Sequence, residues 1–182
     1  ETARELLTGD LAVGRVIARP FTGTSADNFK RTSNRHDFAL SPPSPTMLDI
    51  LEKHGKDVIS IGKIRDIFNG KGITCSYKTT GNADGMDRIR EISRKDFSGL
   101  CFLNLVDFDM LYGHRRDVDG YAQALTDFDR FLGGFMEDMK PDDLLMITAD
   151  HGCDPAYMKT TDHTREDVPV LIYGKSIPGG RD

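Results

Sequence analysis

Residues 143–164 read DLLMITADHGCDPAYMKTTDHT, and they carry the strongest structural signal in the 182-residue chain. The apolar segment LLMI predicts a buried strand, and Asp150 and His151 follow it closely. A second acid–histidine pair, Asp162 and His163, comes twelve positions later. A strand end fixes such side chains while the loop beyond it leaves room for substrate. The stretch therefore predicts a catalytic metal site.

A second apolar segment, residues 99–106 (GLCFLNLV), predicts a strand buried on both faces. It leads into Asp107, Asp109 and His114. Because ligand sites lie beyond the carboxyl ends of parallel strands, the two ligand-rich strand ends predict one shared site. Mixed carboxylate and imidazole ligands suit Mn²⁺, Zn²⁺ or Fe²⁺ better than Ca²⁺. The number of candidate metal ligands favours two ions about 3.5–4 Å apart. Spacing alone does not decide between Asp107 and Asp109 as a ligand.

Strand-like and helix-like segments alternate along most of the chain. Predicted strands cover residues 57–61, 99–106, 144–148 and 168–173, and predicted helices cover 84–94 and 118–139. Another helix should begin with Ser44 as N-cap and Pro45 at its first position, and should stop at Gly55. This alternation predicts an α/β fold with a mostly parallel sheet flanked by helices.

The first part of the chain has a different character. Residues 11–19 resemble a strand, but residues 20–40 are rich in Gly, Ser, Thr and Asn and show no hydrophobic period. The prolines at 42 and 43 force extended backbone, which marks a boundary. We therefore expect one domain segment over residues 1–41 and a second domain over residues 42–182.

Composition excludes several classes of protein. The chain has 24 basic and 29 acidic residues, so its net charge of −5 argues against nucleic-acid partners. No apolar run approaches the roughly 18 residues that a membrane span needs, and no signal peptide is evident. Three cysteines at unrelated spacings indicate reduced thiols in a cytoplasmic protein, and Cys153 is expected to be a small loop residue.

The order of the motifs resembles a known family. TADHG followed by TDHTRE, after NLVDFDMLYGHRRD, resembles the metal-binding half of the alkaline phosphatase superfamily. With GRVIARPF, NRHDFAL and IGKI in the same order, nearly the whole chain resembles the phosphopentomutase family. The resemblance implies exchange of phosphate between ribose 1-phosphate and ribose 5-phosphate, or their 2-deoxy analogues, in nucleoside salvage. It also implies a phosphorylated threonine and two manganese ions.

The resemblance further implies roles for individual residues. It assigns one ion to Asp150 and His151, and the other to Asp109, His114 and His163. It favours Asp109 over Asp107 because the spacing from Asp109 to His114 matches the family. It also implies that Arg15, Arg31 and Lys63 bind the phosphate of the sugar, although basic side chains are usually solvated surface charges. Arg115 and Arg116 are expected to pair with nearby acids.

The same resemblance implies that this chain is one part of a longer enzyme. The threonine nucleophile and a further metal-binding aspartate are expected upstream of Glu1, and residues 1–41 resemble the end of an inserted cap domain. The chain alone is therefore expected to be inactive. Two alternatives stay open: a related metal-dependent phosphatase or cofactor-independent phosphoglycerate mutase, and a binding module without catalysis.

Overall fold

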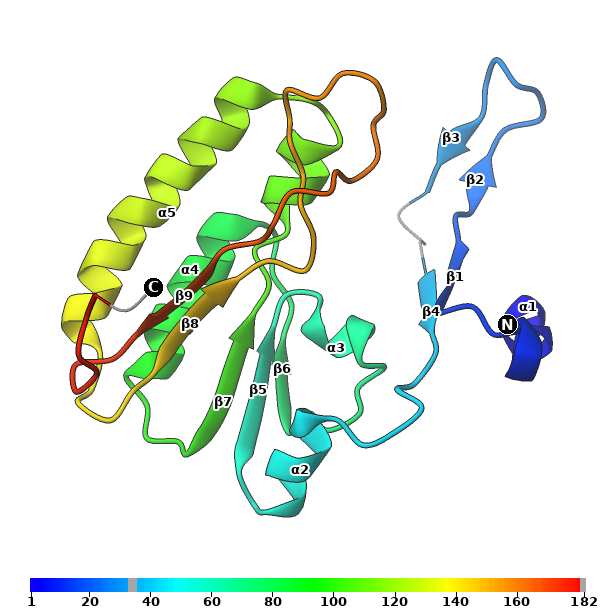
Figure 1. Ribbon diagram of the computed structural model, residues 1–182. Coiled ribbons are helices and arrows are strands. Elements are labelled where there is room, and N and C mark those ends of the chain that lie inside the picture. The colour runs from blue at the N-terminus through cyan, green and yellow to red at the C-terminus, as the bar shows by residue number, and fades with distance from the viewer. Residues whose placement is uncertain (33–35, 181–182) are drawn as a thin grey trace. The chain divides into compact units, whose positions relative to one another are not determined.

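The computed structural model describes residues 1–32 and 36–180, which form two compact units (Figure 1). Unit 1 comprises Glu1–Lys78 and Phe97–Asn104, and unit 2 comprises Thr79–Asp96 and Leu105–Asp182. The predicted boundary after residue 41 separates the end of an inserted cap domain from the metal-binding core, and it stays a prediction.

A three-stranded parallel sheet forms the centre of unit 1. Strand β5 (Asp57–Ile61) lies between β6 (Cys75–Tyr77) and β7 (Gly99–Leu103), as Figure 1 shows. The side chains of Val58 and Ile61 in the middle strand are almost fully buried. The predicted α/β class with a parallel sheet is thereby confirmed, and β5 has the predicted bounds. Strand β6 was missed because only three residues pair.

Two short helices cover the core of unit 1, α2 (Met47–Lys53) and α3 (Ile64–Ile67). The buried cluster combines a side chain from each with two from or beside the sheet: Leu48, Ile64, Val58 and Ile73. Removing such a side chain from water stabilises the fold by about 1.5–3 kcal/mol. The core therefore depends on α2 beginning at the right residue.

Helix α2 begins two positions later than predicted. Its N-cap is Thr46, and not Ser44, because Thr46 and Asp49 form a capping box. The Thr46 amide and hydroxyl both donate to the Asp49 carboxylate, at 2.6 and 2.7 Å. These hydrogen bonds hold the pKa of Asp49 below its ordinary value. The predicted stop is confirmed, since Gly55 follows the helix with a φ of 67°.

Replacing Thr46 with alanine is expected to lower the free energy of unfolding by about 1 kcal/mol at neutral pH. Because the pKa of Asp49 is lowered in the folded state, its contribution is present above the ordinary carboxyl pKa and is lost as pH falls through the lowered value. The gap between wild type and variant should therefore narrow in acid. Denaturant unfolding at several pH values measures this, with Thr46→Ser as the control that keeps the cap. A gap that is constant with pH would contradict the capping box.

The first 40 residues form short elements. After α1 (Thr2–Leu6) and a 3₁₀ turn, η1 (Gly9–Leu11), strand β1 (Arg15–Ala18) pairs antiparallel with β4 (His36–Ala39). Strand β2 (Phe21–Thr22) pairs antiparallel with β3 (Lys30–Arg31). Sequence reasoning predicted only a loop here for residues 20–40. Ladders of two to four residues are too short to show a period of two, so the pattern could not reveal them.

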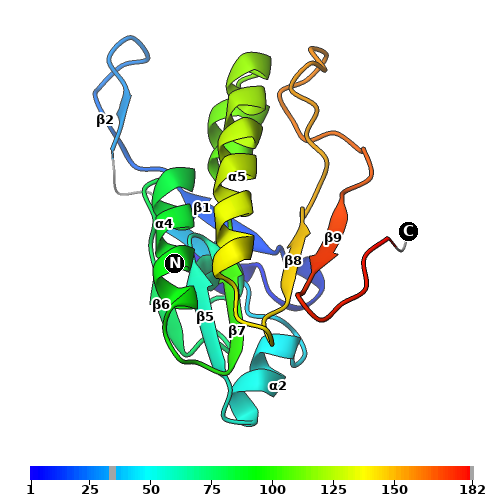
Figure 2. The same cartoon turned by 90° about the vertical axis from the view of Figure 1, so that its left-hand side faces the viewer.

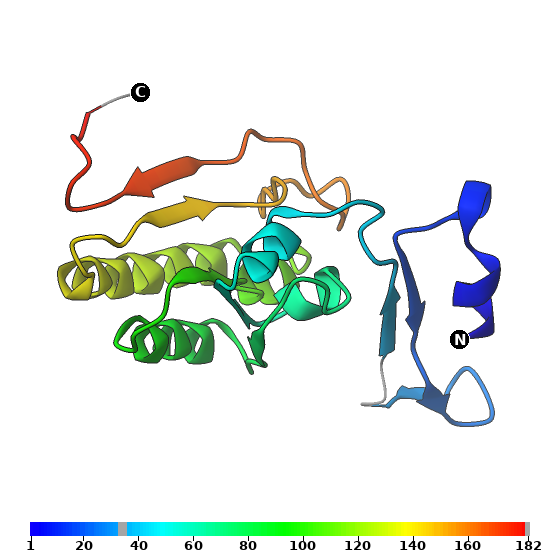
Figure 3. The same ribbon diagram turned by 90° about the horizontal axis from the view of Figure 1, so that it is seen from below.

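Unit 2 contains two helices side by side, α4 (Asn82–Ser93) and α5 (Val118–Asp138), and an antiparallel pair of strands beside α5 (Figures 2 and 3). The Arg90 guanidinium lies 4.7 Å from the centre of the Phe131 ring and links the two helices. Phe135 and Met139 are buried at the end of α5. Among the described residues, no helix is both long enough and apolar enough to cross a membrane.

The strands of unit 2 differ most from expectation. Strand β8 (Leu145–Thr148) pairs antiparallel with β9 (Val170–Tyr173), and one side of the pair lines an apolar groove of about 210 Å³ with residues of α5. Met146 and Val170 are 62% and 64% exposed. The prediction that the strand formed by residues 144–148 is buried is wrong for this chain. Apolar sequence shows what a strand can bury, but only neighbouring elements decide whether it is covered.

Candidate metal centre

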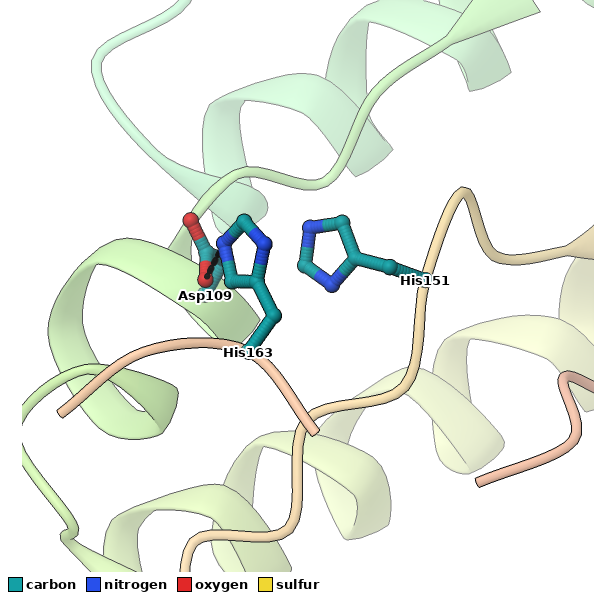
Figure 4. A group of neighbouring side chains, drawn as sticks. All are labelled: Asp109, His151 and His163. Atoms are coloured by element: carbon teal, nitrogen blue, oxygen red, sulfur yellow. Dashed lines mark ion pairs between the residues drawn. The ribbon is translucent and has the colours of Figure 1, made fainter. Parts of the chain in front are cut away.

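Three side chains from separate segments of unit 2 converge on one point. The carboxylate of Asp109 and the rings of His151 and His163 each offer a ligand atom, and these atoms lie within 4.8 Å of one another (Figure 4). Asp109 lies on a π-helix, η2 (Phe108–Gly113), His151 follows β8, and His163 lies in the loop before β9. The two ligand-rich segments predicted from the sequence therefore meet in the structure.

The π-helix explains why Asp109 and His114 lie together. Five positions along an α-helix turn the chain about 140° away from the starting face. In the π-helix the His114 amide instead donates to the Asp109 carbonyl at 2.9 Å, which stacks the two residues. His114 Nε2 consequently lies 3.4 Å from Asp109 Oδ1. Sequence reasoning found both residues but missed the π-helix, whose only signal is this spacing.

A pinched loop brings the two other histidines together. Residues 152 and 164 form an antiparallel bridge, so His151 and His163 flank the neck of the loop between them. Their rings stack with centroids 3.5 Å apart and an interplanar angle of 14°. The neck closes tightly because residue 152 is glycine: a Cβ there would lie 2.8 Å from the backbone nitrogen of Glu166.

The charges in this cluster fit a cation. Asp109 Oδ1 lies 3.5 Å from His163 Nε2, and this buried oxygen accepts no hydrogen bond from the described residues. A buried carboxylate oxygen without a partner is costly, and a metal ion between it and the imidazoles would satisfy it. One carboxylate with neutral imidazoles is a donor set that suits Mn²⁺, Zn²⁺ or Fe²⁺. The residues present therefore fit a divalent ion.

The two remaining aspartates take different positions. Asp150 lies beside the cluster, with its side chain 77% exposed and Oδ1 3.7 Å from His151 Nε2. Asp107 faces α4, where its carboxylate accepts a hydrogen bond of 2.7 Å from the Asn82 amide and its own amide donates to the Asn82 side chain at 2.9 Å. Asp107 is thus engaged as a structural residue. The division of the ligands between two ions stays a prediction.

Cys153 packs against the π-helix near the cluster. A Cβ at Gly113 would lie 2.5 Å from its sulfur, so glycine permits this contact. Burial raises the pKa of the Cys153 thiol, and the negative charge of Asp109 raises it further. The thiol is therefore protonated at neutral pH, which agrees with a packing role and not with a reactive thiolate.

The three candidate phosphate-binding residues belong to unit 1. Arg15 is half exposed and its Nη1 lies 3.6 Å from Asp37 Oδ2. Lys63 stands at the N-cap of α3, immediately beyond β5. Arg31 pairs through its backbone in β3, and its side chain lies outside the described part of the structure. Their roles toward substrate stay predictions.

The sequence interpretation of Arg116 is wrong. Its side chain was expected to pair with acids, but it donates to the backbone carbonyls of four residues: Gly113, Asp154, Thr160 and Asp162. One of these carbonyls, of Gly113, lies three positions away, but the others lie 38 to 46 positions away along the chain. No local sequence pattern could therefore show these hydrogen bonds.

Comparison with known proteins gives consistent matches. The family model described as the metalloenzyme superfamily matches residues 8–181. The chain is 56% identical over 178 residues to a phosphopentomutase of Limosilactobacillus reuteri. The matched region covers 97% of this chain and 45% of that protein. It is 57% identical to the phosphopentomutases of Carboxydothermus hydrogenoformans and Acetivibrio thermocellus, over 96% and 97% of this chain. The chain thus spans a little under half the length of these relatives.

Proposed function

The chain belongs to the metalloenzyme superfamily, and from this membership we propose that it forms the metal-binding part of a phosphopentomutase. The enzyme would interconvert ribose 1-phosphate and ribose 5-phosphate, or the 2-deoxy sugars. One observation carries the proposal: Asp109, His151 and His163 meet in a chain that is 54–57% identical to proteins of that name.

The proposed centre holds two divalent ions, for which we favour manganese. The five residues expected to hold them are Asp109, His114, Asp150, His151 and His163. When bound, such ions neutralise charge that develops on phosphoryl oxygens. The chain prepares this site itself: the nitrogen Nδ1 of His114 lies 2.6 Å from the Thr161 carbonyl, which turns the other ring nitrogen toward Asp109.

We assign the phosphate group of the sugar to Arg15, Arg31 and Lys63. Guanidinium groups bind phosphate through two parallel hydrogen bonds, and an ammonium group adds a compact positive charge. Residues 1–41 would belong to a cap that keeps water from the phosphoryl group, so that phosphate returns to the sugar. The three free cysteines favour a cytoplasmic setting.

We further propose that a phosphothreonine outside these 182 residues takes part in the transfer. Two observations support this: the chain covers 45% of its relatives, and β8 and β9 expose apolar side chains that further sequence would cover. The 182-residue chain alone should show no mutase turnover, while the longer protein that contains it should be active with Mn²⁺. Measurable mutase turnover by the chain alone would contradict this part of the proposal.

A substrate panel tests the activity itself. The intact protein, supplied with Mn²⁺, is assayed with ribose 1-phosphate, 2-deoxyribose 1-phosphate, phosphoglycerate and an aryl phosphate. We expect turnover of the pentose phosphates and formation of the 5-phosphates. Release of inorganic phosphate as the main product would instead indicate a phosphatase, and turnover of phosphoglycerate alone would indicate the other mutase class. A protein that binds no divalent ion would be a binding module.

A further inference from the structure

Arg116 follows the π-helix η2, and all five donors of its guanidinium group are used. Nε and Nη2 donate to the Thr160 carbonyl at 2.8 and 2.5 Å, and Nη2 also donates to the Asp162 carbonyl at 2.5 Å. Nη1 donates to the carbonyls of Asp154 and Gly113, at 2.9 and 3.2 Å. One side chain therefore ties the end of the π-helix to both sides of the loop at residues 154–162.

These four partners are neutral backbone carbonyls, so the guanidinium group acts on them as a fork of donors and not as half of an ion pair. Lysine could not replace it, because an ammonium group has three donors on one atom and cannot reach four separated carbonyls. The backbone of Arg116 also has a φ of 57°, which residues other than glycine seldom adopt. Such a conformation persists where surrounding contacts fix it.

The loop has little else to hold it against the π-helix. Its other hydrogen bonds are local, such as the Tyr157 amide to the Asp154 carbonyl at 3.2 Å and the His163 amide to the Asp162 side chain at 2.9 Å. Among the described residues, two more side chains reach residues 155–163 from the helix: His114 at the Thr161 carbonyl, and Asp109 at His163 Nε2. Arg116 thus holds the carbonyls of Thr160 and Asp162, and Asp162 directly precedes His163.

We propose that Arg116 is a positioning residue of the metal centre. By fixing the carbonyls of Thr160 and Asp162 it sets the His163 imidazole beside the carboxylate of Asp109, which the π-helix holds from the other side. Side chains that orient metal ligands commonly change metal affinity about 10- to 100-fold when they are replaced. The inference rests on the proposed function only in requiring that this centre binds a metal ion.

The test uses three variants of the intact protein. Arg116→Lys keeps the charge but loses the fork, and Arg116→Gly removes the side chain while accepting the positive φ without strain. Arg115→Lys is the matched control, because Arg115 is the exposed neighbour on the same turn. Amide hydrogen exchange of residues 154–163 is measured without metal, and Mn²⁺ affinity is measured by calorimetry. Guanidinium ion at low millimolar concentration is then added to Arg116→Gly.

We expect both Arg116 variants to exchange faster in this loop and to bind Mn²⁺ about 10- to 100-fold more weakly, whereas Arg115→Lys matches wild type. Added guanidinium should restore part of the affinity of Arg116→Gly.

Unchanged amide exchange in the loop would overturn the clamp, meaning the hydrogen bonds by which Arg116 holds residues 154–162, whether or not the protein binds metal. Faster exchange with unchanged Mn²⁺ affinity would overturn the positioning role. Loss of cooperative unfolding in both variants would show that Arg116 holds the fold instead. Wild-type protein that binds no Mn²⁺ would refute the proposed function and leave the exchange result to decide the clamp.

Discussion

Replacing Asp109 with asparagine is expected to weaken Mn²⁺ binding by the intact protein at least about 100-fold, more than the loss of a residue that merely orients a ligand. The variant keeps the shape of the side chain but removes a negative charge that lies beside both His114 Nε2 and His163 Nε2. Mutase turnover should fall with it. Calorimetric titration with Mn²⁺ measures the first effect, and a coupled assay measures the second.

Asp107→Asn is the matched control, because this residue lies two positions away on the same segment. Its side chain accepts from the Asn82 amide, and an amide oxygen can keep that hydrogen bond. We therefore expect the control to bind Mn²⁺ like wild type and to lose at most about 1 kcal/mol of unfolding free energy. The opposite pattern, with Asp107→Asn losing the metal and Asp109→Asn retaining it, would exchange the roles of the two aspartates.

Gly152→Ala is expected to abolish the metal centre without touching a ligand. The added methyl group would lie 2.8 and 2.9 Å from the backbone nitrogen and oxygen of Glu166, which cannot move aside as a flexible side chain would. The neck between residues 152 and 164 must open, and the stacked rings of His151 and His163 then separate. Overpacking of this kind costs about 1–3 kcal/mol of stability. Unfolding experiments and Mn²⁺ calorimetry on the intact protein check both effects.

Gly133→Ala separates this effect from a general intolerance of alanine. Gly133 lies in α5, and a Cβ there meets nothing within 4 Å. The substitution should raise the free energy of unfolding by about 0.5–1 kcal/mol, because glycine is a poor helix former, and should leave metal binding unchanged. If Gly152→Ala binds Mn²⁺ as tightly as Gly133→Ala, the neck of the loop does not position the histidines.

Sequence reasoning predicted the elements whose signal is local. The strand at Asp57–Ile61 was predicted with its observed bounds, and the helix at Val118–Asp138 within one residue. Both have strong signals: a short apolar run rich in β-branched residues, and an apolar stripe with a period near 3.6. The start of α2 was misplaced because a capping box at Thr46 and Asp49 outweighs a proline at a first helical position. The pairs of the first 40 residues were missed because they are so short.

The sequence by itself determined which groups are available for chemistry. Carboxylates and imidazoles stand directly after apolar runs, and that placement depends only on neighbouring residues. The tertiary structure decided how they are used: a π-helix stacks His114 on Asp109, and Asp107 turns to Asn82. It also decided the role of Arg116, which reaches a carbonyl 46 positions away. The physical reason is that periodicity and capping act over a few residues, whereas a metal centre is built from contacts between distant segments.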